Sequence, residues 1–478
     1  MRPGALALAA GRVVAGHRLF VGLLAAAAAL RVAAQIAYRP ALFFYGDSFA
    51  YLANAAVLRP ETIRPAGYPA FLRAMLWIHD LAVVPAVQHV LGLLTGTLVY
   101  ALVRRLGVGP VGACIAAAPV LFDAYQLNIE QHILSEAPFT LLIVAALVLL
   151  LWHARPSYST CVGVGVLLAV AGLTRSVGLA LIAPALVFAI VRGGLLRTLA
   201  LAAAFALPLA GYAAWYSSAV PHGTFTLTDH EGYFLYGRVA DFASCSGLRI
   251  SAAERRVLCD PRPPAERPTP NYYVWHQWAH ERYPGFPRLP ARRNAVLESF
   301  AVGVIHRQPV AYARTVLHDM EHYASFGHST GRHDEPVSEW QFSAGRSQTR
   351  RQVARLRSEV RSWGGSIGGT VWLQRVLRAY QRVVYTPGPL LLAAVILALA
   401  GAALGTTAGA GRPLRAEMLT LAAAGVLIPL VAAMSSMFDY RYLLPALPLL
   451  PAAGVLGATA LYARARTLRA AQPDPVSS

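Results

Sequence analysis

The chain has 478 residues, of which 56% are hydrophobic and 14% are charged, and its formal net charge is +19. Soluble domains carry about 25% charged residues, so this composition excludes an ordinary soluble domain and indicates a membrane protein. Every basic residue is Arg, and these residues lie mainly in short loops and in one long polar segment. Orientation in a lipid bilayer explains that distribution better than a nucleic acid partner does.

Several apolar stretches approach the roughly 17–25 residues that a transmembrane helix needs. We therefore predict an all-α polytopic membrane protein, a transmembrane helix bundle of about ten spans with one long, partly helical external segment. The third, fifth and sixth stretches are short or interrupted. The stretches are centred near Leu24, Leu93, Ala117, Val144, Leu167, Val187, Ala204, Ile396, Leu427 and Gly454.

Arg residues flank alternate ends of these stretches, and short loops rich in Arg stay in the cytoplasm. The alternation predicts a multi-pass plasma membrane protein with both termini in the cytoplasm. It divides the chain into a membrane core over 1–217, an extracytoplasmic segment over 218–384 and C-terminal transmembrane helices over 385–478. The first stretch has features of a signal peptide. Because a polar loop and nine further stretches follow it, we expect an uncleaved anchor.

The external segment contains two of the four Cys residues, Cys245 and Cys259. An extracytoplasmic compartment permits disulfides, so we expect these thiols to be bridged. Apolar residues between 292 and 326 recur at helical spacing on both sides of Pro309, which predicts two consecutive helices. A basic helix that faces solvent or lipid headgroups is expected over 346–361.

One short stretch of this segment matches a metal-binding pattern. His318 and His322, with Glu321 between them, fit His-x-x-Glu-His, which places two imidazoles one helical turn apart. The sequence marks no third ligand, so we favour a polar helix face over a zinc site.

Five polar motifs fall on the predicted extracytoplasmic side of the apolar stretches. Polar groups at membrane depth are expensive and usually functional. A transporter would be expected to keep some of them near the bilayer midplane, so the one-sided distribution favours an enzyme at the outer surface. The motifs are Gly46-Asp47-Ser48, Arg64-Pro65-Ala66-Gly67-Tyr68-Pro69, His132-Ile133-Leu134-Ser135-Glu136, Thr174-Arg175-Ser176-Val177-Gly178 and Asp439-Tyr440-Arg441.

In this order along the chain, the motifs resemble those of the GT-C superfamily of multi-span glycosyltransferases, which includes the protein O-mannosyltransferases and the lipid A aminoarabinose transferases. The resemblance is best over the first seven spans. It implies an inverting transferase that moves a sugar from a polyprenyl-phosphate donor to a hydroxyl on an acceptor glycan, lipid or protein, at the extracytoplasmic face. A transporter or flippase for lipids or lipid-linked glycans is the alternative, because it would share the hydropathy.

The resemblance implies that Asp47, in the first external loop, is the catalytic base. It implies that Arg64, ahead of the Pro-x-x-Tyr turn, contacts the donor phosphate. Many members carry a second acid after the first, and here Ser48 takes that place. Arg175 and Arg441 are expected to bind the same phosphate, because the guanidinium fork matches phosphate oxygens.

The remaining candidates are expected to bind substrate. His132 and Glu136 lie one helical turn apart and share a face, and Glu130 and Tyr68 complete the set. The two acids and the His could instead hold a divalent metal ion or cap the next span, and no other cofactor is implied. We expect the segment 218–384 to bind the acceptor.

Overall fold

The structure is a computed structural model that describes residues 17–44, 46–277, 286–287, 289–327, 331, 334–343, 350–405 and 413–470. The described residues form helices and no named strand, which confirms the predicted all-α fold. Both ends of the chain, whose cytoplasmic location the Arg pattern predicts, lie outside the described residues. The same is true of residues 346–349 of the expected basic helix.

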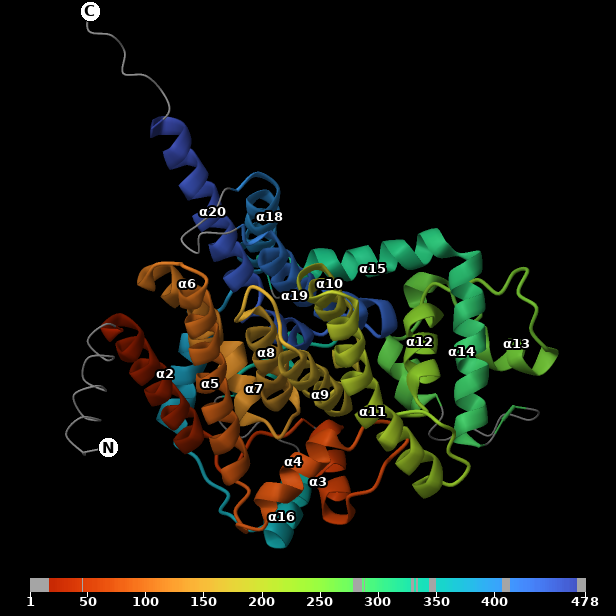
Figure 1. Cartoon of the computed structure of the whole chain (residues 1–478). Coiled ribbons are helices and arrows are strands. Elements are labelled where there is room, and N and C mark those ends of the chain that lie inside the picture. Colours follow the sequence, from red (N-terminus) through yellow and green to blue (C-terminus); the bar gives the residue numbers. More distant parts are fainter. Residues whose placement is uncertain are drawn as a thin grey trace, which may run out of the picture.

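Each predicted apolar stretch is centred in a helix (Figure 1). These helices form the bundle in the left and central part of the view. They are α2 (Arg18–Ala37), α5 (Val83–Arg105), α6 (Pro110–Phe122), α8 (Glu136–Leu151), α9 (Tyr158–Thr174), α10 (Ile182–Gly193), α11 (Leu195–Ala219), α18 (Gly388–Leu404), α19 (Arg415–Ser435) and α20 (Leu450–Ala470).

Five helices among the described residues are long and apolar enough to cross a membrane, or up to eight spans if each bent pair counts as one. The bent pairs join α6 to α7 (Ala124–Gln131), α17 (Val371–Val383) to α18, and η5 (Tyr440–Ala446) to α20. Helices α8 and α9 are apolar but have only 16 and 17 residues. The polytopic membrane prediction is confirmed, and the expected number of about ten spans requires these two shorter helices to cross as well.

The bend between α6 and α7 has a cause in Asp123. Its carboxylate accepts hydrogen bonds from the backbone N–H of Tyr125, at 2.9 Å, and of Thr386, at 2.6 Å. The first bond caps α7, and the second ties this cap to the loop before α18. The polar residues of α7 are thereby held at a fixed position beside the bundle.

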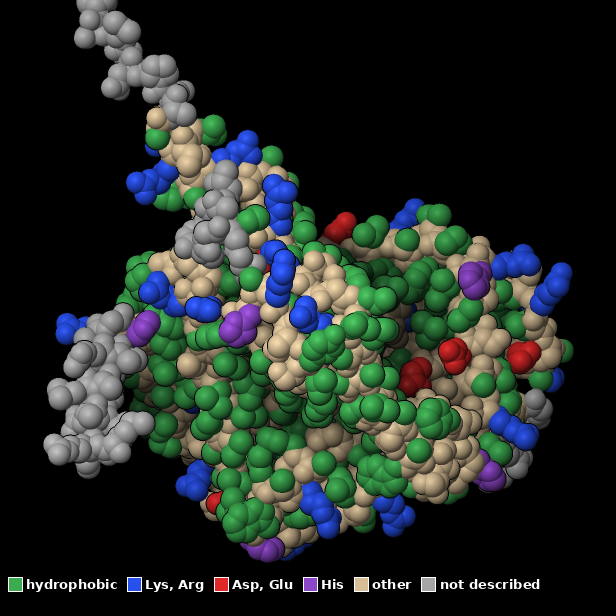
Figure 2. Space-filling view, viewed as in Figure 1, with side chains coloured by type: hydrophobic (Ala, Val, Ile, Leu, Met, Phe, Trp, Pro, Cys, Tyr) green, Lys and Arg blue, Asp and Glu red, His purple; other side chains and the backbone are tan. Residues whose placement is uncertain are grey.

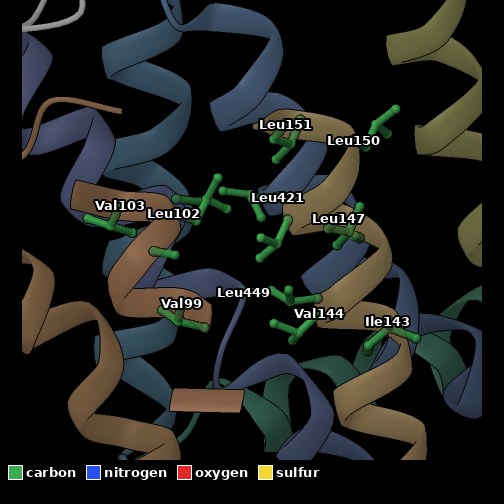
Figure 3. Packing of buried hydrophobic residues seen from close by; sticks show 14 of the residues in the cluster. Val99, Leu102, Val103, Ile143, Val144, Leu147, Leu150, Leu151, Leu421 and Leu449 are labelled. Carbon is green, nitrogen blue, oxygen red and sulfur yellow. The ribbon is translucent and has the colours of Figure 1, made fainter. Parts of the chain in front are cut away.

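The main core lies between α5, α8 and α19 (Figure 3). Leu102 of α5, Leu147 of α8 and Leu421 of α19 are all buried there. Helices in lipid are held by close van der Waals packing, which small residues favour. Helices α18 and α20 pack closely at Gly457, where a Cβ would lie 2.1 Å from the carbonyl oxygen of Leu397.

The surface supports a bundle that lies in a bilayer. Hydrophobic side chains cover much of the visible face over the bundle, and Arg side chains gather at its upper and lower edges (Figure 2). Charged groups avoid the hydrocarbon region and settle at its two boundaries.

The first part of the segment 218–384, which we expect to be extracytoplasmic, forms a helical group on the right in Figure 1. Helices α12 (Glu231–Ala240), α13 (Ala252–Leu258) and α14 (Pro290–Arg307) pack around Tyr236, Leu297 and Phe300. Helix α15 (Pro309–Tyr323) follows and packs against α19, with Tyr323 buried beside Phe438. The two helices expected around Pro309 are confirmed. So is the disulfide between Cys245 and Cys259, whose Cα atoms are 6.0 Å apart.

Three short helices lie at the lower end of the bundle in Figure 1: α3 (Asp47–Val57), α4 (Gly67–Leu76) and α16 (Arg350–Trp363). The short helix η4 (Val337–Trp340) packs against α7 and η5. The basic helix α16 lies beside α3 and α4 (Figure 1). The guanidinium carbon of Arg355 is 4.2 Å from the ring centroid of Phe49. Helix α16 therefore packs against α3, the helix that begins with Asp47.

Candidate active site

Asp47 is the first residue of α3, and its carboxylate lies between two guanidinium groups. Arg64 donates to Oδ1 from Nε at 3.1 Å and from Nη2 at 2.5 Å. Arg441 donates to Oδ2 from Nη1 at 2.8 Å. Each carboxylate oxygen therefore has its own Arg partner.

Arg64 lies in the loop between α3 and α4, and this loop is held at both ends. The backbone N–H of Asp229 donates to the carbonyl of Thr62 at 2.8 Å, and that of Ala66 donates to the Tyr212 hydroxyl at 3.1 Å. The next residue, Gly67, faces α9 so closely that a Cβ would lie 2.5 Å from the carbonyl oxygen of Leu173. The Gly of the Arg-Pro-x-Gly-Tyr-Pro motif is therefore required by packing.

Arg441 belongs to η5 and is held more tightly than Arg64. Asp439 caps η5 by accepting from the Arg441 backbone N–H at 3.0 Å, and it accepts from Nε of the same residue at 2.7 Å. The rings of Phe44, Trp340 and Tyr442 surround the guanidinium, with centroids 4.9, 5.0 and 5.2 Å from its central carbon. Arginine stacks well on aromatic faces, so this orientation is fixed before any substrate arrives.

A second ion pair extends the group. Glu136 begins α8, and its Oε1 pairs with Arg175, the residue that ends α9. The same Oε1 lies 3.7 Å from Arg441 Nη1. Arg64, Asp47, Arg441, Glu136 and Arg175 thus form one continuous chain of alternating charges, which we call the Asp47 network.

The electrostatics of the Asp47 network favour an ionised carboxylate. Burial raises the pKa of Asp47, but the positive charges of Arg441 and Arg64 outweigh this effect and hold that pKa well below its ordinary value. The Asp47 and Arg64 side chains are 16% and 15% exposed, so a substrate can reach them from solvent or from the membrane surface.

Tyr68 and His132 lie next to this network. The Tyr68 hydroxyl donates to Gln88 Oε1 at 2.9 Å, and Gln88 Nε2 donates in turn to the His132 carbonyl at 2.6 Å. The His132 ring is 5.9 Å from the Trp340 ring, and its Nδ1 is 2.9 Å from the Asn128 carbonyl. Burial lowers the pKa of His132 to about 4, so the ring is neutral at ordinary pH.

Glu130 is not brought to the Asp47 network. Its carboxylate pairs with Arg31 of α2, at 2.9 and 3.0 Å, and with His89 Nδ1 of α5, at 3.0 Å. All three side chains are buried, and the group joins α2, α5 and α7. A substrate-binding role for Glu130 remains a prediction, and its contacts are those of a residue that holds helices together.

Within the described residues, no group of three or more His, Cys, Asp or Glu side chains could hold a metal ion. The rings of His318 and His322 are 4.3 Å apart on α15, and His322 Nδ1 is 3.0 Å from Asp334. These contacts make a polar helix face on which His322 pairs with a neighbouring acid.

No motif or spacing in the sequence identifies some residues of the site. Trp340 and Phe44 flank Arg441, and Asn128 faces the same region. Trp340 is one of eight Trp residues, and it follows no spacing that would distinguish it. The role of Asp439 could have been predicted, because it stands two residues before Arg441 in the motif Asp439-Tyr440-Arg441.

The comparisons with known proteins agree with this architecture. Residues 83–217 match the family model described as dolichyl-phosphate-mannose-protein mannosyltransferase. No curated protein and no solved structure matches the chain. The matched region covers less than a third of the chain and runs from α5 to α11, so it includes Glu136 and Arg175 but not Asp47, Arg64 or Arg441. The match confirms the resemblance to GT-C membrane glycosyltransferases.

Proposed function

We propose that the protein transfers a sugar from a polyprenyl-phosphate donor to a hydroxyl acceptor, with inversion, at the extracytoplasmic membrane face. The observation that carries this proposal is the position of Asp47 between Arg64 and Arg441. A carboxylate can accept a proton from a hydroxyl, and two Arg forks beside it suit a phosphate leaving group. The name of the matching family describes mannosyl transfer to protein, and we extend only the donor class and the reaction type to this chain.

In the proposed reaction, the acceptor oxygen attacks the anomeric carbon of the sugar while Asp47 takes the hydroxyl proton. The bond between the anomeric carbon and the phosphate oxygen breaks, and its electron pair leaves with the phosphate. The products are the glycoside and polyprenyl phosphate. One displacement inverts the anomeric centre, and Arg64, Arg175 and Arg441 stabilise the charge that develops on the phosphate.

The ion pairs of the Asp47 network imply an order of events. Both Arg64 and Arg441 already bind Asp47, so a donor phosphate must compete with the carboxylate for a guanidinium. Arg64 is the one that can turn, because Arg441 is also held by Asp439 and three rings. When Arg64 turns to the phosphate, Asp47 loses one cation and becomes more basic. Donor binding would thus activate the base.

The lipid tail of the donor requires an apolar path to the site. On α9, Val162, Val166 and Val170 are exposed, 44%, 41% and 39% respectively. Residues four apart share one face of a helix, so these three form an apolar stripe. The stripe ends shortly before Arg175, and we propose that the polyprenyl chain lies along it.

The alternative, a transporter, would use polar groups inside the bundle. The Arg31–Glu130–His89 group is the candidate for such a role. Its side chains are at most 5% exposed. Arg31 and His89 both pair with Glu130, and their remaining polar atoms contact the Leu121 carbonyl and Gln131, so the group offers no free charge. This observation favours the enzyme.

Purified protein with a radiolabelled polyprenyl-phosphate sugar and a panel of glycan, lipid and peptide acceptors tests the proposal. We expect label in one acceptor class, an inverted anomeric centre by NMR, and release of stoichiometric polyprenyl phosphate. Movement of an intact lipid-linked sugar across sealed proteoliposomes, without release of polyprenyl phosphate, would favour the transporter instead.

A further inference from the structure

Three buried polar side chains beside the Asp47 network have hydrogen-bonding capacity that the described residues do not fill. They are both amide atoms of Asn128, Nε1 of Trp340 and Oε2 of Glu136. Asn128 and Trp340 are 0% exposed and Glu136 is 1% exposed. Buried polar groups without partners are costly and rare in folded proteins, so three of them in one region call for an occupant.

The three side chains belong to segments that pack against one another, since α7 contacts η4 and η5, and α8 contacts η5. Trp340 lies against the guanidinium of Arg441, and the free Oε2 of Glu136 belongs to the carboxylate that faces the same guanidinium. Asn128 lies on α7 between Tyr125, which packs on Tyr440, and Leu127, which packs with Phe342. This face of α7 looks toward η4 and Trp340.

His132 connects Asn128 to Trp340. Its Nδ1 contacts the Asn128 carbonyl, and its ring meets the Trp340 ring edge to face. Its Nε2 has no bond to another described residue in the structure. Among segments that pack together, the region thus presents a neutral imidazole, an indole N–H, an amide and a carboxylate oxygen, with Trp340 and Glu136 beside Arg441.

We propose that Asn128, Trp340 and Glu136 form the subsite that holds the sugar of the donor and reads its hydroxyl groups. The inference rests on the proposed function, because it places the sugar beside the Arg residues that would bind its phosphate. Each sugar hydroxyl both donates and accepts a hydrogen bond. The indole N–H donates, the carboxylate oxygen accepts and the amide does both, so the set matches a polyhydroxylated ring and not the bare phosphate.

The subsite predicts strong selectivity for the sugar. A site built to hydrogen-bond a substrate hydroxyl rejects an analogue that lacks it by roughly 10⁴–10⁵-fold, because its own polar groups then stay unpaired. For donors that lack one hydroxyl, kcat/KM should therefore fall far more than the small change in donor size would cause. Ordered water is the competing occupant, because it would satisfy the same atoms without any selectivity.

Trp340→Phe and Asn128→Ala separate these possibilities. Trp340→Phe removes the N–H but keeps an aromatic ring over Arg441. For each variant we would measure kcat/KM for the sugar donor and the inhibition constant of polyprenyl phosphate, which has no sugar. We expect kcat/KM to fall about 10–100-fold per variant, as for the loss of one hydrogen-bonding partner, with the inhibition constant unchanged within about twofold. Trp372→Phe, at an exposed position of α17, is the matched control and should change neither value.

Three results would overturn the inference. Equal losses for donor and polyprenyl phosphate would mean that the two residues only support the fold. Unchanged kcat/KM in both variants, with equal use of deoxy donors by the unsubstituted protein, would leave water as the occupant. If both variants still discriminate among deoxy donors as the unsubstituted protein does, other residues bind the sugar. Failure of the proposed function itself would differ from these results, because the unsubstituted protein would then transfer no sugar to any acceptor.

Discussion

Asp47 Oδ2 accepts a hydrogen bond from Arg441 Nη1 at 2.8 Å across 394 residues of sequence. The contact joins the start of α3 to η5, just before the last apolar helix. Because Asp439 and three rings hold Arg441 in place, the carboxylate of Asp47 is positioned by the fold of both ends of the chain. The candidate site is therefore complete only when η5 has packed against α3.

Arg64 should matter more for the donor than for the acceptor. Arg64→Ala removes the guanidinium that we propose turns toward the phosphate, and we expect kcat/KM for the donor to fall about 10²–10³-fold with the acceptor KM nearly unchanged. Arg64→Lys should recover only part of this loss, since an ammonium lacks the bidentate fork. Arg357→Lys on the exposed face of α16 serves as the control. If Arg64→Ala leaves the donor KM and kcat unchanged, Arg64 is only an interfacial anchor.

The apolar helices could be predicted from the sequence because their signal is local: each predicted centre lies in a helix. The disulfide could also be predicted, since two Cys residues share the long polar segment that we expect to be external. The separation of Glu130 from Glu136 could not. Both acids stand in one short stretch, but α7 ends at Gln131 and the chain turns, so one acid faces Arg31 and the other faces Arg175.

Trp340 shows a second limit of sequence reasoning. Its partners Phe44, His132 and Arg441 lie far from it in the chain. No periodicity within η4 marks its position, because this helix has only four residues. Sites assembled from distant loops can be recognised only when the fold brings those loops together.

The buried group around Glu130 should control stability. Glu130→Gln leaves Arg31 as a buried charge without an ionised partner, which typically costs about 3–5 kcal/mol. Gly92→Ala should also destabilise the bundle, because its Cβ would lie 2.0 Å from Glu130 Oε1. Thermal unfolding in detergent measures both effects.

A double-mutant cycle checks the cause. Glu130→Ala removes the atoms that the new methyl group meets, so Gly92→Ala should cost clearly less in that background. Gly22→Ala on α2, where a Cβ meets nothing within 4 Å, is the matched control. Additive effects of the two substitutions would contradict the contact.

The disulfide should stabilise the external helices but not the bundle. A bridge over 14 residues contributes about 3 kcal/mol in the chain-entropy model. We expect the double variant Cys245→Ser/Cys259→Ser to insert and purify normally, with faster hydrogen exchange in α12, α13 and α14 and weaker acceptor binding. Cys114→Ala/Cys161→Ala, at the buried free thiols, is the control. Unchanged exchange and unchanged acceptor KM would show that the bridge does not shape an acceptor site.

His132 should make stability depend on pH. Burial lowers its pKa to about 4, while an unfolded His titrates near about 6.5. The unfolded chain therefore binds an extra proton between these values, so stability is full above about 6.5 and falls as the pH drops toward about 4. The slope due to His132 is at most about 1.4 kcal/mol per pH unit.

Unfolding of the His132→Gln variant measured over this pH range isolates that contribution. The difference in stability between the variant and the unsubstituted protein should shift steadily as the pH falls, in favour of the variant. His153→Gln, at an exposed position, should show no such trend. A pH-independent difference for His132→Gln would mean that the folded protein protonates this ring as readily as the unfolded chain does.

The central claim is that Asp47 accepts the proton of the acceptor hydroxyl. Asp47→Asn keeps the size of the side chain but removes this capacity, and the measurement is kcat for sugar transfer with the fold checked by thermal unfolding. We predict a fall of roughly 10²–10⁴-fold in kcat with a donor KM that does not rise, because Arg64 and Arg441 are released for the phosphate. Glu266→Gln, an exposed carboxylate, should transfer normally. Transfer by Asp47→Asn at a rate close to that of the unsubstituted protein would contradict the account.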